Sequence, residues 1–386
     1  MRLERVDATD ARAVLRGLRS AVLGAGPAIA LGGEDDLPRE VPAGTAVVVT
    51  TSGSSGYPKA VALSRSALTA SAMATAARIG SGSWLLALAP GYIAGVQVLV
   101  RALVAGNEPA VVAGPFRTAS FVAAASSMAS SRGGERVPTF TSLVPAQLQT
   151  LLDEPAGCRA LAGFAAVLVG GQALPPALAA RANEAGIRIV RTYGSSETAG
   201  GCVYDGIPLD GVGVRIVDGE VHVSGPTLAD GYLGEPERTS AAFVRDDAGV
   251  RWYRTGDAGR FDGRLTVTGR RDNVIVSGGV NVSLDRVERI VRTLPGFVDA
   301  VVVPVADERW GEASIVVAVG ASSSDAPVDA DLPAVRDLVG DELGAPARPR
   351  AILRVPRLPT LPSGKPDRAA LTALARTWAE SSGDSR

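Results

Sequence analysis

Short apolar segments alternate with alanine-rich segments through the first half of the chain. Five apolar segments have the length of buried strands: 45–50, 84–90, 108–114, 164–171 and 187–194. Between them lie residues 66–79 and 174–186, whose alanine content favours helices. Strands that alternate with helices along a chain are typical of an α/β domain with parallel strands. We therefore predict such a domain in this half of the chain.

The pattern changes near residue 206. Residues 211–225, 251–261 and 263–270 are short strand-like segments separated by Gly-Asp or Asp-Gly pairs. Asp-Gly between alternating apolar positions is a strong signal for a tight β-hairpin. We expect hairpins and a small barrel or antiparallel sheet from about 206 to 271.

A compact α+β unit is predicted after Asp272. Ser283 is a plausible N-cap for a helix over 284–294, which places five apolar residues on one face: Leu284, Val287, Ile290, Val291 and Leu294. Apolar segments at 300–305 and 313–320 predict strands, and 334–343 predicts a further helix. The predicted domains are therefore 1–271 and 272–386.

Composition and charge exclude several classes of partner. The chain has 386 residues and a formal net charge of -1, so no global field attracts nucleic acid or an anionic membrane. The longest apolar segment, 91–106, carries Arg101 in its middle and is too short to cross a bilayer. Residues 21–33 imitate a targeting signal, but glycines and Pro27 interrupt the segment and acidic residues precede it. We expect a cytoplasmic protein.

Few residues are available for metal or thiol chemistry. The cysteines Cys158 and Cys202 are too few for a disulfide framework and lack metal-ligand spacing. The one histidine, His222, lies in an alternating strand pattern, where we expect a surface or edge position. A Ser-His-Asp nucleophile or a histidine-based zinc site is therefore disfavoured.

Residues 51–59, TSGSSGYPK, follow a predicted strand and offer hydroxyl groups, backbone N–H groups and a lysine to an anion. A Walker motif requires Gly-Lys followed by Ser or Thr. Here Lys59 follows Pro58, and the other candidate, Lys365, precedes Pro366. The segment is therefore suited to phosphate but is not a P-loop.

The same segment resembles the signature loop of the adenylate-forming superfamily, which includes acyl- and aryl-CoA synthetases, non-ribosomal adenylation domains and luciferases. Further segments resemble other blocks of that superfamily in the same order: VGGQALPP at 169–176, YGSSET at 193–198, GEVHVSGPTLADGY at 219–232, YRTGD at 253–257, GRRDNVIVSGGVNVSLDRVE at 269–288 and LPTLPSGKPDR at 358–368. The resemblance implies a large N-terminal α/β domain with a β-rich part, followed by a small mobile α+β domain.

The resemblance also implies an ATP site. The implied ATP- and AMP-binding residues are Thr51, Ser52, Gly53, Ser54, Ser55, Gly56, Lys59, Gly170, Gly171, Tyr193, Gly194, Ser195, Ser196, Thr198, Asp257 and Arg270. In such enzymes the glycine-rich loop holds the pyrophosphate, Tyr193 stacks on adenine and Asp257 accepts from the ribose hydroxyls. Glu197 contributes to Mg²⁺ binding. Taken alone, Tyr193 could equally be a core aromatic and Asp257 a turn residue.

Catalysis is implied to depend on domain rotation. Attack of a carboxylate on the α-phosphate of ATP needs positive charge where negative charge develops, and the resemblance assigns this to Lys365. Rotation at the hinge, Asp272, withdraws the lysine and brings in the loop with Ser277, Gly278 and Gly279 for attack by the thiol of CoA. In isolation Asp272 could be only a surface charge, and the glycines only a bend.

Two segments indicate which acid is activated. TSLVPAQL at 141–148 and AGVQVLVRALVAG at 94–106 resemble o-succinylbenzoate-CoA ligases of menaquinone biosynthesis, some of which have a similarly short segment before the signature loop. Many relatives place a histidine in the substrate loop, whereas this chain has Tyr92 there. The candidate substrate-binding residues are Tyr92, Arg101 and Ser142.

o-Succinylbenzoate has a second carboxylate that is not adenylated and needs a partner if it is enclosed. Arg101 could hold it with two hydrogen bonds, or it could lie on a solvated helix face. Other interpretations are a ligase for a benzoate-like or medium-chain fatty acid, a domain that loads a carrier protein, or a non-catalytic nucleotide-binding relative. The expected small-molecule partners are a carboxylic acid, ATP and CoA, and a homodimer would be unsurprising.

Overall fold

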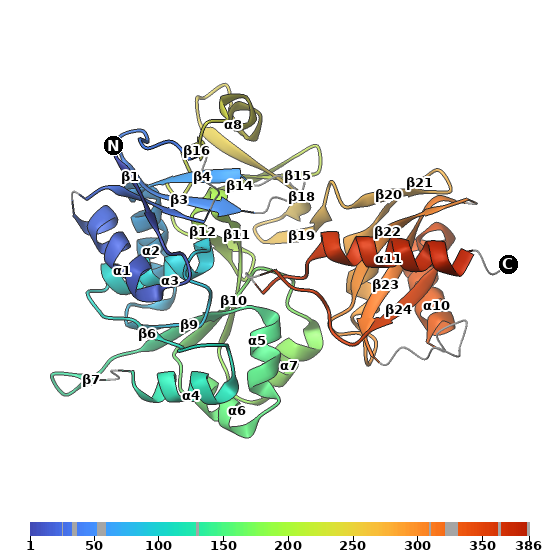
Figure 1. Ribbon diagram of the computed structural model, residues 1–386, viewed down its shortest axis with the longest axis horizontal. Coiled ribbons are helices and arrows are strands. Elements are labelled where there is room, and N and C mark those ends of the chain that lie inside the picture. The colour runs from blue at the N-terminus through green and yellow to red at the C-terminus, as the bar shows by residue number, and fades with distance from the viewer. Residues whose placement is uncertain are drawn as a thin grey trace. The chain divides into compact units, whose positions relative to one another are not determined.

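The structure is a computed structural model that describes residues 1–24, 26–32, 37–51, 59–128, 131–308, 310–320, 331–361 and 364–383. The chain forms two compact units (Figure 1). The first contains 1–174, 178–255 and 261–266, and the second contains 175–177, 256–260 and 267–386. We describe each unit by itself.

The first unit contains a five-stranded sheet. Its strands in spatial order are β1 (Leu3–Val6), β2 (Ala28–Leu31), β3 (Thr45–Thr51), β4 (Lys59–Ser64) and β16 (Gly231–Tyr232). The first three are parallel, and β4 runs antiparallel to both β3 and β16. Helix α1 (Ala11–Leu18) and a π-helical turn at Arg19–Leu23 follow β1. The predicted strand at 45–50 is confirmed as β3.

A seven-stranded sheet forms the centre of the same unit. Its spatial order is β13 (Ile207–Pro208), β12 (Gly200–Tyr204), β11 (Ile189–Ser195), β10 (Ala166–Val169), β9 (Thr139–Leu143), β5 (Ser83–Leu86) and β6 (Ala110–Val111). The five strands from β6 to β11 are parallel, which confirms the predicted α/β pattern. A short hairpin, β7 (Ser131–Arg132) and β8 (Glu135–Arg136), lies apart from it.

Helices cover both faces of the seven-stranded sheet. One face contacts α2 (Arg65–Ile79) and α3 (Ile93–Val104). The other packs its apolar side chains, including Leu85 and Val167, against four helices. These are α4 (Thr118–Ser126), α5 (Pro145–Leu152), α6 (Pro155–Ala162) and α7 (Pro176–Glu184). Side chains alternate between the faces of a strand, so Trp84 lies on the α3 side while Leu85 lies in the opposite core.

The β-rich region forms a sheet that contains antiparallel pairs, as predicted. Its order is β14 (Gly213–Val217), β15 (Glu220–Ser224), β18 (Arg251–Phe261) and β17 (Phe243–Arg245), with β19 (Leu265–Arg270) paired to β18 and α8 (Pro236–Ala242) preceding β17. Asp218 and Gly219 both have positive φ in the turn between β14 and β15, at 49° and 76°. Two such residues match the twist of paired strands, so the predicted Asp-Gly hairpin is confirmed.

The expectation that His222 occupies a surface or edge position is wrong. Its strand, β15, lies between β14 and β18, and the residue is 4% exposed. The imidazole Nε2 is 3.6 Å from the Glu220 carboxylate, which also accepts a hydrogen bond of 3.0 Å from Arg254. Alternation identified the strand but not the neighbours that cover both of its edges.

His222 is expected to make stability depend on pH. Burial lowers the pKa of His222, and the nearby Arg215 and Arg254 lower it further, against an opposing effect of Glu220. Arg215 is itself paired with Asp246 of the adjoining loop. The unfolded chain then binds a proton more readily, so this contribution is present above about pH 6.5 and is lost as pH falls below it.

The measurement is the melting temperature at pH values between 7.5 and 5.5, for wild type and His222→Gln. The wild type should lose more stability over this interval than the variant. Parallel pH profiles for the two proteins would contradict the assignment.

The second unit is an α+β sandwich. Its sheet has the order β21 (Val280–Ser283), β20 (Val274–Ser277), β23 (Gly311–Val319) and β22 (Val301–Asp307), with β24 (Ala351–Val355) parallel to β23. Alternate residues of β22 and β23 face α9 (Leu284–Val291) and α10 (Leu332–Leu343) on one side and α11 (Arg368–Gly383) on the other. The predicted helix at 284–294 ends at Val291, although Leu294 still packs against the same core.

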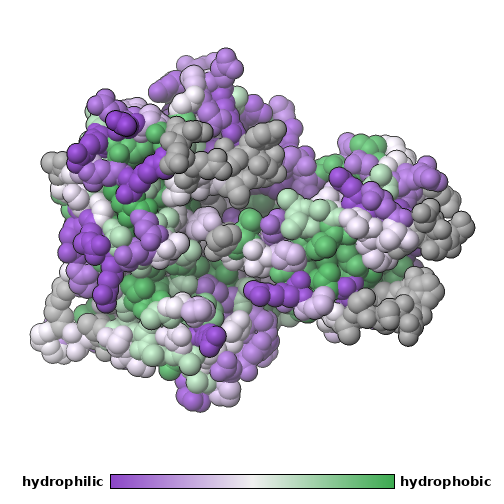
Figure 2. All heavy atoms as spheres, viewed as in Figure 1, coloured by the Kyte–Doolittle hydropathy of each residue, from purple (hydrophilic) through white to green (hydrophobic). Residues whose placement is uncertain are grey.

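The predicted boundary at Asp272 stays a prediction, because β18 and β19 contribute residues to both units. Hydrophilic side chains are spread widely over the face shown in Figure 2. Within the described ranges no helix is both long and apolar enough to span a membrane.

Candidate active site

Part of the signature loop lies outside the described residues, namely the predicted phosphate-binding residues Ser52, Gly53, Ser54, Ser55 and Gly56. Its two ends are described. Thr51 closes β3 and Lys59 opens β4, and the two residues are directly paired across the antiparallel ladder. The sheet therefore holds Thr51 and Lys59 side by side.

Lys59, Glu197 and Tyr232 form a buried polar cluster. Lys59 Nζ donates to Glu197 Oε1, and Tyr232 OH donates to the same oxygen at 3.0 Å. The ammonium also lies 3.3 Å from the phenol oxygen and 4.9 Å from the centre of its ring. Three elements meet here, because β16 pairs with β4 and the turn bearing Glu197 follows β11.

The charges in this cluster are well defined. Burial raises the pKa of Glu197, but the ion pair and hydrogen bond with Lys59 outweigh it, so the net pKa lies below the usual value. Burial and the negative charge of Glu197 raise the pKa of Tyr232 and of the neighbouring Tyr253. At neutral pH the cluster therefore contains an ionised carboxylate with a cation and neutral phenol groups beside it.

Hydrogen bonds and close packing hold the turn that carries Glu197. Thr198 Oγ1 accepts from the backbone N–H of Ser195 at 2.8 Å and donates to the carbonyl of Gly200 at 2.8 Å. The carbonyl of Glu197 accepts from Ala229 N–H at 2.8 Å. Gly194 is required because a Cβ there would lie 2.0 Å from the Gly200 carbonyl oxygen. These contacts explain Gly194 and Thr198 of YGSSET, and Ser196 is buried beside them.

Two other predicted nucleotide-binding features lie at the ends of parallel strands. Gly170 and Gly171 follow β10, and a Cβ on Gly170 would meet Thr192 Oγ1 at 2.3 Å. Tyr193, on β11, is half-buried. Adenine stacking by Tyr193 stays a prediction.

In the second unit Arg270 joins two predicted residues. Its Nη1 lies 3.2 Å from Asp257 Oδ1, while Nε and Nη2 contact the two carboxylate oxygens of Asp272 at 3.0 and 2.9 Å. Asp257 is part of β18 with a largely buried side chain, so its interpretation as only a turn residue is wrong. The Asp272 side chain is 54% exposed but paired.

Ser277, Gly278 and Gly279 lie where β20 turns into β21. Both glycines have positive φ, and a Cβ on Gly278 would lie 2.5 Å from the ring of Trp310. Gly278 N–H donates to the Trp310 carbonyl at 2.8 Å. Gly278 is therefore required by close packing as well as by the bend. A Cβ on Gly279 would meet no described atom within 4 Å, so only its positive φ favours glycine there.

Lys365 lies on a tight turn before α11. Its carbonyl accepts from Leu361 N–H at 2.8 Å, Gly364 has a φ of 80°, and Thr360 and Pro366 form a β-bridge. The Lys365 side chain is exposed. Although the chain has 39 lysines and arginines in total, its only lysines are Lys59 and Lys365, both at predicted site positions.

Arg101 is buried rather than solvated. Its side chain extends from α3, the residue is 6% exposed, and Nη2 donates to Tyr204 OH at 3.2 Å. The guanidinium carbon lies 5.0 Å from the centre of the Trp84 ring. The alternative that placed Arg101 on a solvated helix face is therefore wrong. Within the described chain no carboxylate pairs with it, and Nε has no hydrogen-bond partner.

The three predicted acid-binding residues are not all neighbours. Ser142 belongs to β9, on the face that α3 covers, and its buried hydroxyl finds no partner among the described residues. Gln97, one helical turn before Arg101, also has a buried, unpartnered Oε1 and lies over Gly200. Tyr92 caps the start of α3, roughly 13 Å along the helix axis from Arg101.

Several residues of these clusters were missed by the sequence analysis: Gln97, Tyr204, Tyr232 and Tyr253. Tyr232 ends the segment GEVHVSGPTLADGY, but nothing in the sequence pattern showed that β16 would pair with β4. Gln97 could have been found, because a polar residue one turn from Arg101 in an apolar helix is unusual.

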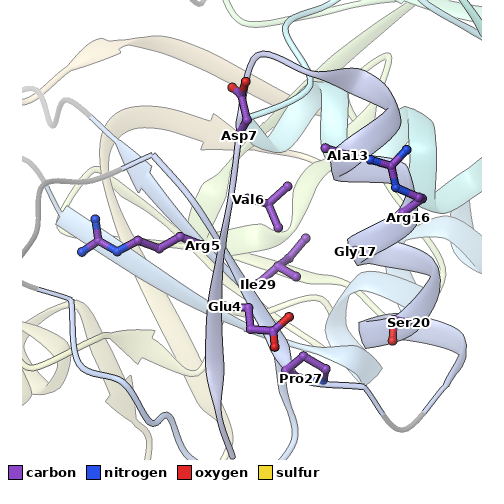
Figure 3. A pocket seen from close by; sticks show the side chains of 10 residues that line it. All are labelled: Glu4, Arg5, Val6, Asp7, Ala13, Arg16, Gly17, Ser20, Pro27 and Ile29. Atoms are coloured by element: carbon purple, nitrogen blue, oxygen red, sulfur yellow. The ribbon is translucent and has the colours of Figure 1, made fainter.

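A surface pocket of about 420 Å³ lies elsewhere, between β1 and α1 (Figure 3). Val6 and Ile29 point toward α1, whereas Arg5 points away. None of the predicted site residues lines this pocket. The pocket therefore gives no support to a catalytic role for any of the predicted site residues.

Family models match most of the chain. The AMP-binding enzyme model matches residues 6–233, and the AMP-binding enzyme C-terminal domain model matches 286–365. A probable 2-succinylbenzoate–CoA ligase of Mycobacterium tuberculosis is 42% identical over 84% of this chain and 83% of the relative. The 2-succinylbenzoate–CoA ligase of Escherichia coli is 33% identical over 69% of this chain and 57% of its own length.

Solved structures share the fold. A variant of E. coli MenE with bound OSB-AMS has a TM-score of 0.69 at 29% identity, covering 90% of this chain and 72% of that one. The amide bond synthetase McbA of Marinactinospora thermotolerans has a TM-score of 0.71 at 30% identity, covering 90% and 75%. The adenylate-forming fold predicted from the sequence is confirmed, and the chain belongs to the AMP-binding enzyme family.

Proposed function

We propose that this protein is an AMP-forming o-succinylbenzoate-CoA ligase that acts in menaquinone biosynthesis. The acid attacks ATP to give an acyl adenylate and pyrophosphate. The thiol of CoA then displaces AMP and forms the thioester. The observation that carries the choice of acid is Arg101, a buried cation without a carboxylate partner in the described structure.

A buried charge is costly unless an opposite charge meets it. Among the described residues Arg101 retains an N–H without a partner, and polar atoms of Gln97 and Ser142 that also have none lie on the same side of the sheet. This arrangement favours an acid with a second carboxylate over benzoate or a fatty acid. The relatives named as 2-succinylbenzoate-CoA ligases support the same choice.

The nucleotide half of the site fits ATP with Mg²⁺. Mg²⁺ commonly binds through one or two carboxylates together with phosphate oxygens, and Glu197 offers an ionised carboxylate in a hydrogen-bonded turn. Bound there, the ion would neutralise charge that develops on the phosphates. Lys59 would exchange its contact with Glu197 for the leaving pyrophosphate, while Tyr232 keeps the carboxylate oriented.

Residues of the second unit complete the proposed mechanism. Lys365 supplies a compact positive charge between the attacking carboxylate and the α-phosphate. Asp257 accepts from the ribose hydroxyls, and Arg270 fixes its carboxylate. Rotation at Asp272 then replaces Lys365 with the Ser277–Gly279 turn for the CoA step.

The test is CoA-dependent release of AMP and pyrophosphate with o-succinylbenzoate, run beside benzoate and a medium-chain fatty acid. We expect strong selectivity for o-succinylbenzoate. Turnover with another acid alone would reject the substrate and the pathway but retain the mechanism. Absence of both turnover and ATP–pyrophosphate exchange with all three acids would instead indicate a non-catalytic relative.

A further inference from the structure

We propose that Tyr204, supported by Thr75 and Trp84, is a positioning residue that determines specificity by presetting Arg101 for the second carboxylate of the acid. The proposal rests on the proposed function, because it concerns the same acyl site. Tyr204 comes from β12, Thr75 from α2 and Trp84 from β5, so three separate elements fix one guanidinium group.

The direction of each hydrogen bond in this cluster follows from proton counting. Thr75 Oγ1 donates its single proton to the Ser71 carbonyl at 2.9 Å. The contact of 2.8 Å between Thr75 Oγ1 and Tyr204 OH therefore uses the tyrosine proton. Tyr204 oxygen is left as an acceptor, and Arg101 Nη2 donates to it at 3.2 Å. A backbone carbonyl thus sets the orientation of the whole chain of bonds.

The partners of Arg101 are neutral, which is the property that recognition of an anion requires. A carboxylate beside Arg101 would cancel its charge and repel the acid. A phenol oxygen and the face of an indole ring stabilise the cation but leave its charge uncancelled. The unpartnered Nε then remains available to an incoming carboxylate.

The cluster also restricts the motion of the arginine. A free arginine side chain loses considerable rotamer entropy when it is fixed on a ligand. Here Tyr204 is 1% exposed and Thr75 is fully buried, so the acceptor itself cannot move freely. The order that binding needs is therefore present before the acid arrives.

Tyr204→Phe removes the acceptor but keeps the ring and the Thr75–Ser71 bond. We expect KM for o-succinylbenzoate to rise about 10-fold, which corresponds to the lower end of the free-energy range for a hydrogen bond to a charged group. The kcat should change less than about 2-fold. The KM for 4-oxo-4-phenylbutanoate, which lacks the ring carboxylate, should be unchanged. Thr75→Val should act in the same direction but less strongly.

The matched control for Thr75→Val is Thr69→Val. Thr69 lies on the same helix and donates to the carbonyl four residues earlier at 2.9 Å, but it does not contact Tyr204. The KM of the Thr69→Val variant for either acid should match that of wild type. A double-mutant cycle adds Tyr204→Phe to Arg101→Ala, where the tyrosine change should have no further effect on KM.

Melting temperatures of wild type, Tyr204→Phe, Arg101→Ala and the double variant give a measure of Arg101–Tyr204 coupling that needs no acid. Suppose that wild type prefers o-succinylbenzoate but Tyr204→Phe changes KM equally for both acids. The positioning role is then wrong and the proposed function stands. The same conclusion follows if the effects of Tyr204→Phe and Arg101→Ala are additive both in KM and in melting temperature. If wild type does not discriminate between the two acids, both the proposed function and the recognition role of Arg101 are wrong. Non-additive melting temperatures would then support only the Arg101–Tyr204 contact.

Discussion

Replacing Lys365 with alanine is expected to slow adenylate formation by at least ~100-fold, the cost of losing one preorganised donor at a developing negative charge. Conversion of preformed adenylate to thioester should be affected much less, because the proposed rotation removes Lys365 before CoA attacks. The rates are measured separately, by ATP–pyrophosphate exchange and by a single turnover of isolated adenylate with CoA.

The chain itself offers a reason to assign this step to lysine. Of the 39 lysines and arginines, all but Lys59 and Lys365 are arginines, so the sequence places side-chain ammonium groups only at two predicted phosphate contacts. An ammonium is a compact charge that can enter and leave, whereas guanidinium favours a fixed, two-pronged contact. Lys365→Arg should therefore remain strongly impaired in adenylation although its charge is preserved.

The control for a folding defect is the melting temperature, which should be unchanged because the Lys365 side chain is exposed. An equal collapse of both half-reactions in Lys365→Ala would reject domain alternation for this chain. Full adenylation activity would remove Lys365 from the chemistry altogether.

Local signals predicted much of the fold. The Asp218–Gly219 pair identified a hairpin because few residues adopt positive φ, and alternating strands and helices identified the parallel sheet. Boundaries were less well predicted. The predicted strand at 108–114 is only the two-residue β6, since a sheet edge requires little pairing, and the burial of His222 depends on β14 and β18, which lie on either side of its strand.

For the candidate site, too, the sequence identified individual residues but not the contacts between distant ones. Motif resemblance named Glu197 and Lys59 but could not show that they contact each other, because 138 residues separate them. Tyr204 lies 103 residues from Arg101 and 129 from Thr75, and it occupies an ordinary strand position in the sequence. Tertiary pairing of β12 beneath α2 and α3 creates this cluster, so no local pattern could reveal it.

The acid-binding half of the site leads to the second large effect, that of Arg101→Ala. We expect kcat/KM for o-succinylbenzoate to fall at least ~30-fold, because truncating one partner of a buried, hydrogen-bonded charge pair costs about 2 kcal/mol or more. With 4-oxo-4-phenylbutanoate, which has no second carboxylate, the loss should be no more than a few-fold. The measurement is the ratio of kcat/KM for the two acids in wild type and variant.

Two further variants separate charge from shape at this position. Arg101→Lys keeps the charge but loses the fork, so it should recover only part of the selectivity. Arg101→Met fills the space beside Trp84 without charge and should resemble the alanine variant in selectivity while packing better. Because Arg101 has no carboxylate partner in the described structure, removing it leaves no buried anion behind, and both variants should fold. An equal loss for both acids would remove Arg101 from recognition, since a packing defect cannot distinguish an acid by its second carboxylate.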